Sequence, residues 1–153
     1  MEIERKYLIE NVPLDLSQYK KKEIEQGYLN VAPVLRLRRT DDRYTLTYKG
    51  EGLMAREEYN LPFDKDGYER LIKSCLGNII TKTRYLIPYG EYTIELDVFH
   101  GVHDGLVLAE VEFPSLEECN SFVPPEWFGE DVTLTGTYQN SRLCMQNCTS
   151  FNK

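Results

Sequence analysis

The sequence predicts a mainly β (α+β) protein in which eight antiparallel strands form a closed or nearly closed barrel. Short segments of alternating polar and apolar residues dominate the chain, turn signals separate them, and few segments have helical periodicity. The 153 residues, 41% hydrophobic and 28% charged, suit a single domain spanning residues 1–153. No apolar run approaches the roughly 20 residues that a membrane span requires.

Eight segments have the period-two pattern of a strand and are rich in Tyr, Val, Ile, Leu and Thr. They are residues 2–9, 24–31, 34–40, 43–49, 55–61, 79–88, 91–99 and 105–113. Turn signals lie between them, among them Asp41-Asp42, Gly50-Glu51-Gly52 and the segment from Gly101 to Gly105.

Three segments are predicted to be helices, at residues 65–76, 116–122 and 137–147. Asp64 precedes the first as an N-cap and Gly77 follows it as a stop signal. Ser115, with Glu118 three residues later, forms a capping-box pattern for the second. The third closes the chain.

Seven of the predicted strands have one charged face and one largely apolar face, because side chains alternate along a strand. In the first strand, Glu2, Glu4 and Lys6 share a face opposite Ile3 and Tyr7. An ordinary sheet with its polar side in water has the same alternation. It explains the like-charged neighbours on one face less well, since like charges repel unless a counter-ion lies between them. These neighbours are Arg36 and Arg38, Lys82 and Arg84, Glu95 and Asp97, and Glu110 and Glu112.

Closure of the sheet turns one of the two faces into a lumen. The segment 65–76 has an apolar stripe that includes Tyr68, Leu71 and Ile72, and this stripe requires an apolar sheet face outside the barrel. The charged face is therefore expected to line the lumen. Removing so many charges from water is costly without ligands or trapped water, so a charged lumen predicts a ligand site.

The predicted lumen carries a balanced set of charges. Its basic residues are Lys6, Arg36, Arg38, Lys49, Arg56, Lys82 and Arg84, and its acidic residues are Glu2, Glu4, Glu58, Glu95, Asp97, Glu110 and Glu112. Arg and Lys bind phosphate oxygens, and carboxylates without Cys or His favour Mg²⁺ or Mn²⁺ over zinc. A short polyphosphate with divalent cations fits this set. The chain lacks a GxxxxGK[ST] loop, which excludes a P-loop enzyme.

Charge and cysteine content limit the other partners. A net charge of −7 and a pI near 4.9 argue against nucleic acid as a partner. The first residues, MEIERK, lack the apolar segment of a secretory signal. Four cysteines form no CxxC pair and are interpreted as reduced thiols: Cys75, Cys119, Cys144 and Cys148. We expect a cytoplasmic protein with a small-molecule substrate and no nucleic-acid or membrane partner.

Several ordered motifs resemble those of one family. The N-terminal EIERK, residues 2–6, resembles the ExExK signature of the CYTH superfamily, the triphosphate tunnel metalloenzymes. The motifs that follow are QGYL at 26–29, LRLR at 35–38, LTYK at 46–49, REEY at 56–59, KTRY at 82–85, ELDVF at 95–99, AEVEF at 109–113, VT at 132–133 and YQNS at 138–141. The resemblance covers nearly the whole chain. Within the family, the chain resembles the short bacterial inorganic triphosphatases.

The resemblance implies an eight-stranded antiparallel tunnel and a role for most lumen residues. The implied catalytic residues are Glu2, Glu4, Lys6 and Glu112. The implied metal ligands are Glu2, Glu4 and Glu112, with Glu58, Asp97 and Glu110 in or near the set. The implied phosphate-binding residues are Lys6, Arg36, Arg38, Lys49, Arg56, Lys82 and Arg84. Glu95 could instead pair with the basic residues.

The expected function is Mg²⁺- or Mn²⁺-dependent hydrolysis of the terminal phosphate of inorganic triphosphate. Thiamine or nucleoside triphosphate hydrolysis, class IV adenylate cyclase activity and non-catalytic polyphosphate binding remain alternatives. Thr137 and Gln139 stand where many relatives have a basic residue, and Arg142 could substitute for it. The sequence is compatible with a monomer or a homodimer.

Overall fold

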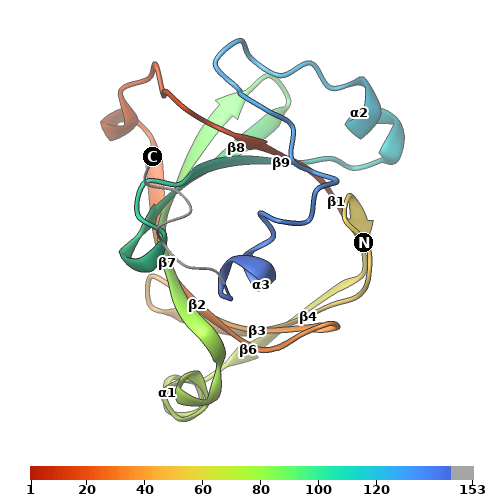
Figure 1. The fold of residues 1–153 in the computed structure, drawn as a ribbon. Helices are drawn as coiled ribbons and strands as arrows, with labels where there is room; N and C mark the ends of the chain where they lie inside the picture. The colour runs from red at the N-terminus through yellow and green to blue at the C-terminus, as the bar shows by residue number, and fades with distance from the viewer. Residues whose placement is uncertain (146–153) are drawn as a thin grey trace.

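The computed structural model describes residues 1–145, which form a single sheet of nine antiparallel strands curled into a nearly closed barrel (Figure 1). The order around the barrel is β5-β1-β9-β8-β7-β2-β3-β4-β6. The strands are β1 (Glu2–Leu8), β2 (Lys20–Val31), β3 (Val34–Thr40), β4 (Arg43–Lys49), β5 (Ala55–Arg56), β6 (Glu58–Phe63), β7 (Leu76–Tyr89), β8 (Tyr92–His100) and β9 (Val107–Glu112).

The strand count is nine rather than eight because the segment predicted at 55–61 divides at Glu57. Its first part, β5, pairs with β1, where Arg56 lies opposite Glu2. Its second part, β6, pairs with β4, where Glu58 lies opposite Lys49. Since β5 and β6 are the two ends of the sheet order, the backbone at Glu57 carries the chain across the closure of the barrel.

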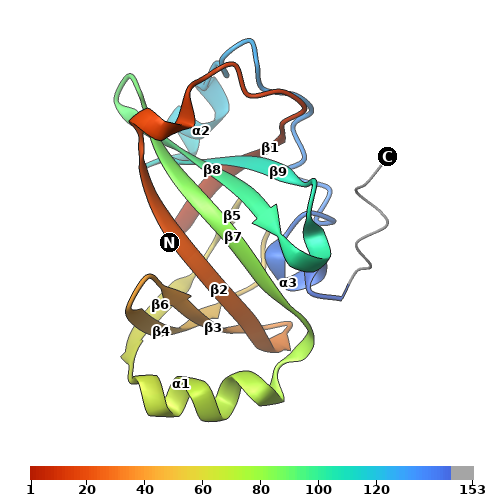
Figure 2. The same cartoon turned by 90° about the vertical axis from the view of Figure 1, so that its left-hand side faces the viewer.

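The apolar outer surface of the barrel is covered by helices at two places. Helix α1 (Lys65–Leu71) lies outside the ring in both views (Figures 1 and 2), and its Tyr68 ring packs 5.0 Å from that of Tyr44 on β4. Helix α2 (Leu116–Ser121) covers a second apolar cluster that contains Tyr7, Val111 and Phe122. The prediction of a charged lumen and apolar outer packing is therefore confirmed.

Both predicted N-caps are present. The Asp64 carboxylate accepts a hydrogen bond from the Gly67 backbone N–H, and the Ser115 hydroxyl accepts one from the Glu118 N–H at 3.2 Å. The predicted helix at 65–76 is shorter than expected: α1 continues as a 3₁₀ turn, η2 (Ile72–Ser74), and β7 begins at Leu76. Two further 3₁₀ turns are η1 (Leu16–Gln18) and η3 (Gly101–His103), the latter within the turn predicted between the last two strands.

The C-terminal helix differs most from its prediction. Helix α3 spans Asn140–Leu143 only, and it lies within the outline of the ring rather than outside it (Figure 1). Leu143 is fully buried there. Residues 146 and 147 of the predicted helix, together with Cys148, fall outside the described residues. Cys75, Cys119 and Cys144 are free thiols.

Every helix within residues 1–145 is too short or too polar to span a membrane.

Candidate active site

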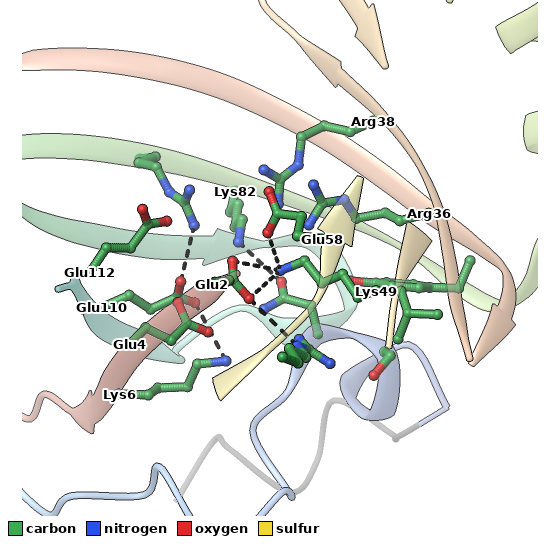
Figure 3. Close-up of a pocket in the computed structure, with 16 residues that line it drawn as sticks. Glu2, Glu4, Lys6, Arg36, Arg38, Lys49, Glu58, Lys82, Glu110 and Glu112 are labelled. Carbon is green, nitrogen blue, oxygen red and sulfur yellow. Dashed lines mark hydrogen bonds and ion pairs between the residues drawn. The ribbon is translucent and has the colours of Figure 1, made fainter. Parts of the chain in front are cut away.

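The inward faces of the strands form a charged pocket in the lumen (Figure 3). Seven cationic and five anionic side chains line it: Lys6, Arg36, Arg38, Lys49, Arg56, Lys82, Arg84, Glu2, Glu4, Glu58, Glu110 and Glu112. Strand alternation in the sequence predicted all twelve. Of the fourteen charged residues predicted for the lumen, Glu95 and Asp97 are absent from the pocket lining.

Three of the carboxylates form a cluster. Glu2, Glu4 and Glu112 each offer an oxygen, and these oxygens lie within 4.8 Å of one another. Their proximity follows from sheet pairing, since Glu4 on β1 lies directly opposite Glu112 on β9. Within residues 1–145, neither Glu4 nor Glu112 has a side-chain hydrogen bond or ion pair.

Two members of the cluster, Glu4 and Glu112, have no cation paired with them among residues 1–145. Burial, followed by the charges of Glu110 and Glu2, raises the pKa of Glu4. Loss of solvent around the carboxylate, followed by the charges of Glu95 and Glu2, raises the pKa of Glu112 to about 7. A divalent cation would remove this repulsion, and clustered carboxylate oxygens are the ligands that Mg²⁺ and Mn²⁺ prefer. The residues therefore fit a hard divalent cation.

Glu2 belongs to the cluster and also contacts two cations, Lys49 and Arg56. Lys49 donates to both of its oxygens at 3.0 and 2.9 Å, and Arg56 Nε lies 3.5 Å away. Lys49 Nζ also lies 3.4 Å from Glu58. Burial opposes ionisation of Glu58, but hydrogen bonds with Glu2 and Asn60 and the charge of Lys49 lower its pKa to about 2.

Glu110 is ion-paired, unlike Glu4 and Glu112 beside it. Lys6 Nζ lies 3.4 Å and an Arg84 guanidinium nitrogen 3.7 Å from its carboxylate. Although burial acts in the opposite direction, Lys6 and Arg84 hold the pKa of Glu110 well below its ordinary value. Lys6 also donates to the Tyr138 carbonyl at 3.0 Å, which fixes its ammonium against the C-terminal segment.

Asp97 lies behind the pocket and is fully buried. It accepts hydrogen bonds from Arg84 at 2.7 and 2.8 Å and from Lys82 at 2.6 Å. Although burial opposes it, the charges of Arg84 and Lys82 lower the pKa of Asp97. Arg84 also pairs with Glu95 at 3.1 Å, in agreement with the alternative pairing considered for Glu95. Asp97 and Glu95 thus orient cations and lie outside the carboxylate cluster.

Arg36 and Arg38 are the lumen cations without an anionic partner among the described residues. The other five each have a carboxylate within 4.0 Å. Arg36 donates to the Thr47 hydroxyl at 3.3 Å, and its buried Nε has no partner. Arg38 Nε donates to the Gln26 amide oxygen at 2.6 Å. Cations with unused donors beside a pocket fit a ligand with anionic oxygens.

The sequence analysis assigned no site role to several residues around the pocket, although four of them lie in the motifs QGYL and YQNS. Tyr28, Val34, Asn140 and Ser141 complete the lining, and Gln26 bonds to Arg38 behind it. Alternation along the second predicted strand was a signal for Gln26 and Tyr28, because both share a face. Strand alternation cannot identify the two residues of α3.

Thr137 and Gln139, together with Arg142, line a separate hollow that adjoins the pocket at Val34, Arg56 and Ser141.

Among residues 1–145, a curled sheet encloses a carboxylate cluster beside arginines that have no anionic partner, which defines a class of barrel proteins with a charged internal pocket. A sequence model described as the CYTH domain matches residues 1–122, and the chain belongs to this family.

Two named relatives and one solved structure are similar along nearly the whole chain. The chain is 39% identical over 149 residues to an inorganic triphosphatase of Nitrosomonas europaea, covering 94% of this chain and 97% of the relative. It is 35% identical over 147 residues to an inorganic triphosphatase of Acetivibrio thermocellus, covering 93% and 92%. The crystal structure of the inorganic triphosphatase NE1496 superposes with a TM-score of 0.72 at 36% identity, covering 95% of each chain.

Proposed function

We propose that this protein hydrolyses inorganic triphosphate with the help of Mg²⁺ or Mn²⁺, releasing one phosphate and pyrophosphate. The observation that carries the proposal is the juxtaposition, in one pocket, of the carboxylate cluster of Glu2, Glu4 and Glu112 with Arg36 and Arg38. The first set suits a hard divalent cation and the second suits phosphate oxygens. The likeness to relatives named inorganic triphosphatase supports the choice of substrate.

The carboxylate cluster would hold the metal. A divalent cation bound there supplies Lewis-acid polarisation of phosphate oxygens and acidifies bound water. Glu110 and Glu58 remain near the site as partners of Lys6 and Lys49, which they keep oriented toward the lumen. Asp97 does the same for Lys82 and Arg84.

The basic residues would bind the triphosphate. Arg36 and Arg38 provide positive charge that no carboxylate within 4.0 Å compensates among residues 1–145, and Arg guanidinium groups bind phosphate oxygens in a bidentate manner. The cations that pair with carboxylates would complete the phosphate-binding site: Lys6, Lys49, Arg56, Lys82 and Arg84.

In the reaction, water attacks the terminal phosphorus and the bond to the bridging oxygen breaks, so negative charge accumulates on departing pyrophosphate. Arg36 and Arg38 would stabilise that charge through hydrogen-bond donors that are already in place. Glu2, Glu4, Lys6 and Glu112 are the residues to which we assign catalytic roles. We place the activity in the cytoplasm, where free thiols such as Cys75 and Cys119 stay reduced.

The test is release of phosphate and pyrophosphate from inorganic triphosphate, thiamine triphosphate and ATP, each with Mg²⁺, Mn²⁺ or EDTA. We expect metal-dependent loss of one phosphate from inorganic triphosphate, with ATP much slower. Cyclic AMP with pyrophosphate from ATP would instead identify a cyclase. Tight binding of triphosphate without turnover would identify a non-catalytic polyphosphate-binding module.

A further inference from the structure

Gln26 on β2 is a fully buried amide next to the pocket. Its Oε1 accepts a hydrogen bond from Arg38 Nε at 2.6 Å, and its Nε2 donates to Asn140 Oδ1 at 2.8 Å. Asn140 Oδ1 also accepts from Lys82 Nζ at 3.1 Å. Gln26 and Asn140 thus form a relay of two amides from Arg38 on β3, across β2 and α3, to Lys82 on β7.

Chemistry fixes the direction of this relay. Arg and Lys side chains only donate hydrogen bonds, so Gln26 must present its oxygen to Arg38 and Asn140 must present its oxygen to Lys82. The Gln26 NH₂ then has an acceptor in Asn140. Rotating either amide by 180° would set N–H groups against a cation. Each member of the relay therefore has one favoured orientation.

The partner of Arg38 is neutral, whereas the neighbouring arginine on β7 has anionic partners. Arg84 contacts Asp97, Glu95 and Glu110, which compensate its charge. Gln26 gives Arg38 a short hydrogen bond without adding negative charge. Burial, followed by the positive charges of Arg36 and Arg84, lowers the pKa of Arg38 to about 9, in keeping with an uncompensated cation.

We propose that Gln26, anchored by Asn140, is a positioning residue that aims Arg38 at the lumen and leaves its positive charge available to the triphosphate. This inference rests on the proposed function and extends it to a residue outside the charged set. It assigns to the amide a task that a carboxylate at this position would defeat, because a carboxylate would compensate Arg38 and repel the substrate.

A double-mutant cycle tests whether Gln26 acts through Arg38. Gln26→Met, Arg38→Ala and the double variant are compared for the Kd of inorganic triphosphate by calorimetry with EDTA, and for KM and kcat with Mn²⁺. Gln26→Met should raise Kd and KM by roughly tenfold, the lower end of the effect of losing a hydrogen bond to a charged group. The value of kcat should fall as well, because Arg38 also stabilises the charge on departing pyrophosphate. In the Arg38→Ala background the same change should alter Kd by less than about twofold. Equal effects in both backgrounds, or no effect in the first, would overturn the proposal.

Gln26→Glu provides a second test and Gln18→Glu, on the exposed turn η1, its matched control for net charge. Gln26→Glu should raise the Kd for triphosphate more than Gln26→Met does, whereas Gln18→Glu should leave it unchanged. Circular dichroism shows whether each variant is folded. Binding by a folded Gln26→Glu that equals wild type would contradict the role of a neutral partner. Failure of the wild-type protein to bind or hydrolyse triphosphate would instead refute the proposed function.

Discussion

Asp97→Asn removes the carboxylate that joins two buried cations while keeping the shape of the side chain. Asp97 and Lys82 are completely shielded from solvent in their side chains, and Arg84 is about as shielded, with 9% exposed. In the variant, an amide NH₂ replaces one acceptor oxygen and faces a donor. We expect a large loss of stability with little change in metal binding, because Asp97 lies outside the carboxylate cluster.

The loss of stability in Asp97→Asn depends on the partners that Arg84 and Lys82 keep. Breaking a buried ion pair by removing one partner costs about 3–5 kcal/mol. Arg84 keeps Glu95 at 3.1 Å and Glu110 at 3.7 Å. Burial lowers the pKa of Lys82 to about 7 even though Asp97 acts to raise it, so Lys82 can lose its proton near neutral pH. Because Arg84 keeps two carboxylates and Lys82 can become neutral, we expect the free energy of unfolding to fall by about 3 kcal/mol, the lower end of this range. For a chain of this size, that loss corresponds to a Tm lower by roughly 10 °C.

Scanning calorimetry at pH 7 measures the change in Tm, and titration calorimetry with Mn²⁺ measures the metal affinity. Asp42→Asn, in the exposed turn between β3 and β4, is the control for loss of one negative charge and should leave Tm unchanged. An Asp97→Asn variant that melts within about 2 °C of wild type would refute the electrostatic argument. A large loss of Mn²⁺ affinity with unchanged Tm would show that Asp97 is a metal ligand after all.

Three further predictions concern the pocket itself. Glu4→Gln should lower metal-dependent turnover more than roughly 100-fold, since even indirect partners of a metal cost 10–100-fold, while circular dichroism shows an unchanged fold; turnover like that of wild type would remove Glu4 from the ligand set. Because the pKa of Glu112 is about 7, protons compete with the metal for this carboxylate below pH 7, and Mn²⁺ affinity should fall as pH falls. Binding at pH 7 should release protons, which calorimetry in buffers of different ionisation enthalpy detects. An affinity that does not change with pH would contradict this prediction. Arg38→Ala should raise the KM for triphosphate about 10–100-fold at unchanged Mn²⁺ affinity, measured by steady-state kinetics and calorimetry; lost stability with an unaltered KM would indicate a structural role only.

Much of the fold and pocket was predictable because a strand exposes its two faces alternately. The pattern Glu2, Glu4, Lys6 places three charges in the lumen whatever strand lies beside it. The apolar stripe that includes Tyr68 then decides which face is outside, since that ring needs an apolar partner and finds Tyr44. Local chemistry also predicted helix starts at Asp64 and Ser115, because capping depends on residues only three apart.

Features that depend on distant parts of the chain were not predictable in the same way. The division of 55–61 at Glu57 arises because β1 and β4 pair with different halves of one extended segment. The position of α3 in the ring depends on tertiary contacts such as that between Leu143 and His103, 40 residues apart. A periodic pattern carries no information about either, and the residues of α3 that line the pocket were accordingly missed.

The pairing of charges depends on strand register, and here the register itself is informative. Along β1 and β9, Lys6 lies opposite Glu110, a favourable pair, and Glu4 lies opposite Glu112, an unfavourable one. A shift of two residues would keep every side chain on its face and set Lys6 opposite Glu112, so that no carboxylate faced another across this pair of strands. The observed register instead keeps two carboxylates together at the pocket, where burial and then repulsion from neighbouring carboxylates, Glu2 and Glu110 among them, raise the pKa of both. A divalent cation bound between the two carboxylates would attract both and offset this repulsion. The like-charged pair therefore supports the proposed metal site more strongly than the number of acidic residues in the lumen does.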